Sequence, residues 1–580
     1  MSSIGKVASP PRKESTSEEF FFWIKPDTLI EKTQIVKTKS AIGSQEVTFY
    51  GLVTEVFRQS RQSDMGQEID RYDGDVNYEP PFDSPGFNYA QVTILRTVPA
   101  VLCPPKEGCD VLLGEVADAQ MAYGADEIEN KLAVGVVKNG AVHRAGPGFI
   151  DTDYLLGANG GHMNVNGVAG RGTKSSFLLH CNYLLLREAR RLEHERPSDP
   201  ERLRVVPIIL NVKNFDLFHI DRLSKRFKPD EHLPVWKELG ISDPAPFRNV
   251  AYFAPQQKDM TIPVDTGRPT ADVRPYSWSL RDIIERGLFT YLFAEEDVYD
   301  ANFGALVMDL ENKLTQESER GDKRVRTLQP NQPATFDELL EMLKPESQGE
   351  KTSALPGHAP QTVKKLYRRF LRLLLEGGAG ILRRRDQHGH PLDVTAKDTR
   401  DPVVIDLSAL SGLPQLQRFV VATIFRQLVE ERTGSNVQKG LVYLVTLDEL
   451  NRFAPRGSHD PITELIERVA AEMRSQGILL FGAQQQASLV SARVIENAGL
   501  KALGKSGSLE LDQQVWRFLS DSARKKAVTL LPNEKMLIQD SFREPMLVEV
   551  PFPPWALRGQ DAVLEAGGKN SSGFSEFENA

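Results

Sequence analysis

Residues 161–176 read GHMNVNGVAGRGTKSS, and this stretch is the strongest local signal in the sequence. A short apolar strand runs into a glycine-rich turn that ends in Lys174 and Ser175, and an amphipathic helix begins at Ser176. Glycines let backbone N–H groups approach an anion, and a helix N-terminus favours negative charge. The sequence therefore predicts a strand–loop–helix unit that binds phosphate, with Lys174 at the β- and γ-phosphates.

The spacing within this loop differs by one position from the usual phosphate-binding pattern. Gly167 and Gly172 have the expected separation, but Thr173 stands between Gly172 and Lys174. Either Ser175 or Ser176 is then the hydroxyl that binds Mg²⁺, and we take Ser175 as the candidate. The residues expected to contact the nucleotide are Gly167, Gly170, Gly172, Thr173, Lys174, Ser175 and Ser176.

Further apolar runs follow the loop and alternate with amphipathic helices, which is typical of a parallel α/β sheet. Because these runs lack polar alternation, we expect strands buried on both faces. The expected strands are His162–Asn166, Val205–Asn211, Val250–Phe253, Val403–Leu407, Leu441–Leu447 and Ile478–Ala483.

Two of these strands end in polar residues that suit phosphate chemistry. Asp448 and Glu449 follow Leu441–Leu447. In nucleotide hydrolases the first carboxylate supports Mg²⁺ and the second polarises the attacking water as general base. A helix N-cap is the alternative interpretation, and the upstream Lys-Ser loop favours catalysis. Gln485 lies in a run of glutamines after the last strand, where it either holds the attacking water or caps the strand end.

Composition limits the other possibilities. The 580 residues suggest about three or four domains. Lys plus Arg number 71 and Asp plus Glu number 79, so any contact with nucleic acid is local or lies in a pore. Three cysteines without a CxxC pair argue against a disulfide framework or a zinc cluster. No apolar run reaches about 18 residues, and the N-terminus lacks a signal peptide, so we expect a soluble cytoplasmic protein without membrane contact.

The order of loop, acidic pair, helix and glutamine-ended strand resembles the HerA/FtsK class of hexameric ATPases, and its HerA-like members in particular. The resemblance covers most of residues 20–555. It includes Tyr154–Gly157 before the first strand, Asn211–Lys213 after the second, and the closing segment Pro532–Val550. It implies a RecA-like P-loop ATPase core of the α/β class, with a mostly parallel sheet, an N-terminal small β-barrel and a helical insertion.

The β-like runs Val47–Val56 and Tyr89–Leu95 agree with the small barrel, and residues 61–86 between them read as an exposed acidic loop. The expected organisation is a disordered arm at 1–18, the barrel at 19–150, the first part of the core at 151–255, the helical insertion at 256–400, the second part of the core with a C-terminal brace at 401–564, and a disordered tail at 565–580.

The resemblance also assigns roles to individual residues. Lys174 is similar to the P-loop lysine, and Gln485 takes the glutamine position of a strand-end motif. Gln484 and Ala487 depart from the threonine and proline of that motif, and Asn451 stands where many members carry histidine. Arg474 resembles the arginine finger that one subunit offers to its neighbour; a solvated arginine at a helix end is the alternative.

At the level of function, the resemblance implies ATP and Mg²⁺, a homohexamer, and double-stranded DNA in the ring channel. It further implies an effector, either a nuclease or a sirtuin-like NAD hydrolase, docked on the barrel in bacterial anti-phage defence. The alternative is a nucleotide-regulated hexameric scaffold that controls the effector without strong DNA translocation. Candidate DNA contacts, which otherwise form a solvated helix face, are Lys364, Lys365, Arg368, Arg369, Arg372 and Arg383–Arg385.

Overall fold

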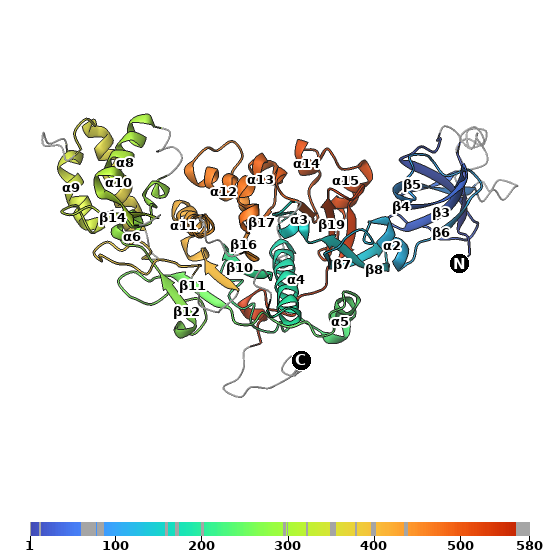
Figure 1. Cartoon of the computed structure of the whole chain (residues 1–580), viewed down its shortest axis with the longest axis horizontal. Helices are drawn as coiled ribbons and strands as arrows, with labels where there is room; N and C mark the ends of the chain where they lie inside the picture. The colour runs from blue at the N-terminus through green and yellow to red at the C-terminus, as the bar shows by residue number, and fades with distance from the viewer. Residues whose placement is uncertain are drawn as a thin grey trace.

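The computed structural model describes residues 2–10, 13–59, 77, 86–156, 160–168, 173–198, 202–293, 297, 300–320, 323–348, 355–376, 380–395, 402–433 and 439–563. The molecule is elongated. A helical region, a central sheet and a β-barrel follow one another along its longest axis (Figure 1). Among the described residues, no helix is both long and apolar enough to cross a bilayer.

The central sheet has twelve strands within the described residues. Neighbouring strands are parallel from β12 to β18 and antiparallel from β18 to β8. The expected α/β class is therefore confirmed. In spatial order the strands are β12 (Val273–Tyr276), β11 (Ala251–Pro255), β15 (Val403–Asp406), β10 (Arg204–Asn211), β16 (Leu441–Leu447), β17 (Ile478–Gln484), β9 (Met163–Asn166), β18 (Leu500–Leu503), β19 (Glu534–Gln539), β20 (Met546–Glu549), β7 (Lys131–Asn139) and β8 (His143–Asp151).

Helices cover both faces of this sheet. Alternate side chains of β10 enter two different hydrophobic cores, as strand geometry requires. Ile208 packs in the core that contains α11 (Pro414–Arg432) and α12 (Pro461–Glu472). Ile209 packs in the core that contains α4 (Thr173–Glu195). Because β9, β10, β16 and β17 are parallel, their carboxyl ends meet at one edge of the sheet.

The N-terminal barrel is present, but its boundaries differ from those expected. It closes through β1 (Gly5–Val7), β2 (Glu19–Ile24), β5 (Phe87–Val98), β4 (Gln45–Gln59), β3 (Ile35–Ile42) and β6 (Asp110–Leu113). The expectation of a disordered arm was wrong for β1, whose backbone pairs with both β2 and β6. The acidic stretch 61–86 lies outside the described residues except for Asn77 and Gly86.

The second difference concerns residues 131–150, which were expected in the barrel. They form the β7–β8 hairpin, which extends the central sheet through β20. A period-2 pattern shows that a segment is a strand but does not identify its pairing partner, so the sequence could not separate the two sheets. Helix α2 (Val116–Ala122) joins barrel and core, where Lys37 and Asp118 form an ion pair of 2.8 Å.

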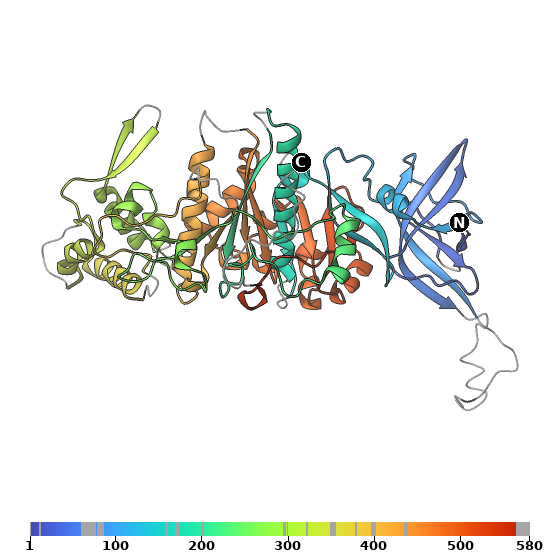
Figure 2. The same ribbon diagram turned by 90° about the horizontal axis from the view of Figure 1, so that it is seen from below.

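The insertion between β11 and β15 is largely helical. Its helices α8 (Ala301–Leu314), α9 (Phe336–Gln348) and α10 (Pro360–Glu376) enclose a cluster of phenylalanines around Phe370. Strand β12 from this segment joins the sheet edge, and β13 (Thr315–Arg320) with β14 (Lys323–Leu328) forms a hairpin within the insertion, which was expected to be helical. Figure 2 shows this hairpin projecting from the helical end. The tail 565–580 lies outside the described residues.

Candidate active site

Charged and amide side chains gather at the carboxyl ends of four parallel strands. Each strand is followed by at least one polar residue that enters the same cluster. The contributions are Lys174 and Ser175 after β9, Lys213 after β10, Asp448 and Glu449 after β16, and Gln485 after β17. The rule that parallel strands present their carboxyl ends together explains why residues so distant in sequence meet here.

Lys174 lies at the start of α4 with only 5% of its surface exposed. Its Nζ has no hydrogen-bond partner among the described residues. Burial lowers the pKa of this amine, while the nearby charges of Asp448 and Glu449 raise it. A buried ammonium without a partner leaves strong hydrogen-bonding capacity unused, which an anionic ligand such as phosphate would satisfy.

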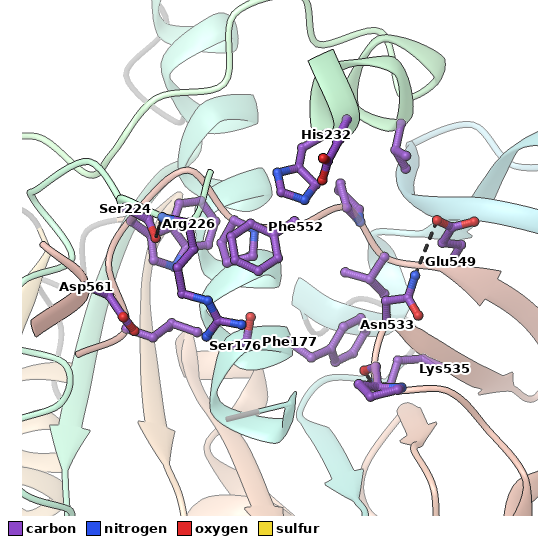
Figure 3. A pocket seen from close by; sticks show the side chains of 18 of the residues that line it. Ser176, Phe177, Ser224, Arg226, His232, Asn533, Lys535, Glu549, Phe552 and Asp561 are labelled. Carbon is purple, nitrogen blue, oxygen red and sulfur yellow. Dashed lines mark hydrogen bonds between the residues drawn. The ribbon is translucent and has the colours of Figure 1, made fainter. Parts of the chain in front are cut away.

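Ser175 and Asp448 form a direct pair beside this lysine. The Ser175 Oγ donates a hydrogen bond of 2.7 Å to Asp448 Oδ2, whereas Ser176 faces a separate cavity (Figure 3). A hydroxyl and one carboxylate fit Mg²⁺, which is commonly held by one or two carboxylates, substrate phosphates and water. The described residues contain no group of three or more His, Cys, Asp or Glu that could hold a metal ion.

Glu449 combines an unusual backbone with a tightly held carboxylate. Its φ of 55° is left-handed, which is uncommon for a residue other than glycine and often marks a functional position. Its Oε1 accepts hydrogen bonds from Lys213 Nζ at 2.6 Å and from Gln485 Nε2 at 3.1 Å. Burial raises the pKa of Glu449, but these two donors and the charges of Lys213 and Lys174 outweigh it and leave the pKa below its usual value.

Lys213 was not recognised as a site residue in the sequence. Its Nζ also lies 3.5 Å from Asp448 Oδ2, so one cation touches both acids. Burial lowers the pKa of Lys213, but the charge of Asp448 and the hydrogen bond to Glu449 raise it above its usual value. The available signal was its position just after β10, at the same sheet edge as the acids.

The two adjacent glutamines at the end of β17 have different surroundings. Gln484 is buried and exchanges hydrogen bonds with Asn164 of neighbouring β9, at 2.7 and 3.1 Å. Gln485 is the one that contacts Glu449. Gln484 therefore links two central strands, and only Gln485 belongs to the acidic cluster.

Other expected site residues lie apart from the cluster or are not described. Arg474 is exposed in a turn before β17, and its Nη1 donates to Gly160 O at 3.3 Å, near the start of β9. It therefore lies at the amino ends of the parallel strands, whereas Lys174 of the same chain lies at their carboxyl ends. Gly167 follows β9, and its N–H donates to Gln484 O. Gly170 and Gly172 lie outside the described residues, as does the side chain of Thr173.

Most of the basic residues considered as DNA contacts pair with aspartates of the same insertion. Lys365 and Arg369 both contact Asp297. Arg384 and Arg385 both contact Asp337, and Arg383 pairs with Asp386. These pairs favour the alternative interpretation, a locally neutralised and solvated surface.

No protein-family model and no curated protein matches the sequence. Among solved structures, VirB4 of Thermoanaerobacter pseudethanolicus aligns at 16% identity and TM-score 0.42, covering 73% of this chain and 98% of its own. The plasmid coupling protein TrwB in complex with the non-hydrolysable ATP analogue ADPNP aligns at 10% identity and TM-score 0.46, covering 78% and 96%. Both TM-scores lie below 0.5.

Proposed function

We propose that this chain is a HerA-like, ring-forming ATP hydrolase of the HerA/FtsK class. The observation that carries the proposal is the buried Nζ of Lys174, which has no hydrogen-bond partner among the described residues and lies near Asp448 and Glu449 at the carboxyl ends of parallel strands. This edge is where open α/β sheets bind ligands. A buried ammonium with a structural role would form hydrogen bonds within the protein, whereas the ammonium of Lys174 can bind the γ-phosphate of a magnesium-bound triphosphate.

Each residue of the cluster has a distinct part in the proposed reaction. Lys174 binds the β- and γ-phosphates, and Ser175 with Asp448 would hold Mg²⁺, which neutralises charge on the phosphate oxygens. Glu449 accepts a proton from the attacking water, for which it must be ionised, and its lowered pKa meets that requirement. Gln485, at 3.1 Å from Glu449, orients the same water.

The assembly belongs to the same proposal. Six copies would close into a homohexameric ring with double-stranded DNA in its channel, and Arg474 would reach the neighbouring subunit's nucleotide. Its exposure, away from the acidic cluster of its own chain, is compatible with a role across a subunit boundary. A nuclease or sirtuin-like NAD hydrolase would dock on the barrel, which stands at one end of the elongated chain (Figure 1), in bacterial anti-phage defence.

A second candidate is a nucleotide-regulated scaffold that controls its effector without strong DNA translocation. The ion pair between Lys213 and Glu449 favours this candidate, because a base engaged by a lysine 2.6 Å away is restrained from activating water. Measuring ATP turnover with and without double-stranded DNA separates the two. A motor turns over faster on DNA, and a scaffold does not respond.

The Lys174→Ala variant tests the nucleotide site. Loss of the ammonium removes several kcal/mol of stabilisation from the transferred phosphate, so we expect ATP hydrolysis to fall at least about 100-fold. Steady-state phosphate release measures this fall. Lys237→Ala, at an exposed position of α5 (Pro229–Glu238), is the matched control and should hydrolyse ATP normally. Normal turnover in Lys174→Ala would contradict the proposed site.

A further inference from the structure

A cavity of about 360 Å³ adjoins the first turn of α4. Its walls come from four segments that are far apart in sequence, namely β8, the start of α4, the segment after β10 and the C-terminal segment. Figure 3 shows side chains of these walls around the cavity. Its volume lies within the range of small-ligand sites. The residues that matter below are Ser176, Arg226, His232 and Phe552.

One wall of the cavity is a rigid aromatic stack. The rings of His232 and Phe552 lie 4.5 Å apart at an interplanar angle of 16°. The backbone N–H of Lys228 donates to His232 Nδ1, which leaves the proton of the neutral ring on Nε2. Burial lowers the pKa of His232. The Phe552 carbonyl accepts a hydrogen bond from Trp236 Nε1 at 2.9 Å, which fixes the backbone beneath the ring.

Arg226 supplies a cation to the same cavity. Its side chain is exposed, and its guanidinium carbon lies 5.7 Å from the centroid of the Phe552 ring. Among the described residues no carboxylate pairs with it. Figure 3 shows the Arg226 side chain extending toward Ser176, at the N-terminal turn of α4. An arginine placed this way can bind a phosphate oxygen, because a guanidinium offers several donors in one plane.

The direction of a bound polyphosphate follows from the two serines. Ser175 faces the acids through Asp448, whereas Ser176 lines the cavity. A triphosphate with its γ end at Lys174 and Glu449 would therefore lead past Ser176 into the cavity. We propose that the cavity receives the nucleoside end of the triphosphate, with the base against the His232–Phe552 stack and Arg226 as a positioning residue at the α-phosphate. This inference rests on the proposed function.

Calorimetric titration of the full chain with MgATP and with magnesium tripolyphosphate tests the inference. Tripolyphosphate has the phosphates but no nucleoside. Phe552→Ala should weaken ATP binding about tenfold, since stacking a base on an aromatic ring is worth about 1–3 kcal/mol. Its affinity for tripolyphosphate should not change. Phe518→Ala, an exposed phenylalanine outside this cavity, is the matched control.

Arg226→Gln should lower the affinity for both MgATP and magnesium tripolyphosphate, because both ligands place a phosphate beside Ser176. Lys225→Gln, which removes the neighbouring exposed cation, should weaken neither. Arg226 is exposed, so its substitution tests the cavity even if Phe552→Ala does not fold. Unchanged ATP affinity in Arg226→Gln, or equal losses for both ligands in a folded Phe552→Ala, would overturn the inference. A wild-type chain that binds neither ligand would instead show that the proposed function itself is wrong.

Discussion

At the scale of single residues, Glu449 is the side chain on which the proposed chemistry depends most. Its carboxylate accepts bonds from Lys213 and Gln485. Glu449→Gln keeps the shape of the side chain but removes the base. We expect ATP binding to persist while hydrolysis falls about 10²–10⁴-fold. Binding by calorimetry and phosphate release on the same sample measure both quantities.

The exposed Glu472→Gln, at the end of α12, is the matched control for that substitution and should leave hydrolysis unchanged. If Glu449→Gln hydrolyses ATP at the wild-type rate, another group is the base. Gln485 cannot replace it, because an amide does not accept a proton in this pH range.

The ion pair between Lys213 and Glu449 leads to a prediction about the pH dependence of ATP hydrolysis. Its hydrogen bond and charge lower the pKa of Glu449, against the effect of burial. A base works when ionised, so activity declines as pH falls through that pKa. Lys213→Met removes the hydrogen bond and the charge that lower the pKa of Glu449, so this pKa rises. The loss of kcat/KM at acidic pH should therefore begin at a higher pH than in the wild type. A profile that stays in place, or moves to lower pH, would show that Lys213 does not control this carboxylate.

Part of this polar cluster at the carboxyl ends of the parallel strands could be predicted from the sequence. Lys174 was predicted from the glycine-rich loop that precedes it, and Asp448 and Gln485 were predicted from polar residues that follow apolar strands. Lys213 follows β10 in the same way, but a lone lysine after a strand has many ordinary explanations. The cavity residues Arg226 and Phe552 could not be predicted to meet, because their chain segments come together only through tertiary packing.

At the scale of secondary structure, buried strands were the most predictable elements. The run Leu441–Leu447 was predicted with the bounds that β16 has, because a continuous apolar stretch between polar residues has few other interpretations. The hairpin β13–β14 was missed, because its residues are densely charged and, where the structure describes their side chains, none is fully buried, so no alternating apolar pattern marks the strands.

The boundary between the barrel and the central sheet leads to a prediction about deletion of the barrel. Because β7 and β8 belong to the central sheet, a deletion of residues 1–113 removes the barrel and leaves that sheet intact. We expect this variant to keep cooperative unfolding and ATP turnover while losing the ability to bind the proposed effector. Deletion of residues 1–150 also removes the β7–β8 hairpin and should destabilise the core, which thermal unfolding measures. Effector binding by the 1–113 deletion would contradict docking on the barrel.

At the scale of the whole molecule, we propose that the chain hydrolyses ATP at sites completed by a neighbouring subunit. Within one chain, Lys174 lies at the carboxyl ends of the parallel strands and Arg474 at their amino ends. The two side chains can therefore contact the same nucleotide only if Arg474 comes from another subunit. Arg474→Ala should assemble and bind ATP yet hydrolyse it about 10³–10⁵-fold more slowly, as when other phosphoryl-transfer enzymes lack their arginine finger.

Mixing Lys174→Ala subunits with Arg474→Ala subunits tests whether the site is shared between subunits. In mixed rings, some interfaces combine an intact Lys174 from one variant with an intact Arg474 from the other. We predict that ATP hydrolysis, measured after exchange of fluorescently labelled subunits, recovers to a level that neither variant reaches alone. If exchange is complete and no activity returns, the shared site is contradicted and Arg474 has no role across the subunit boundary.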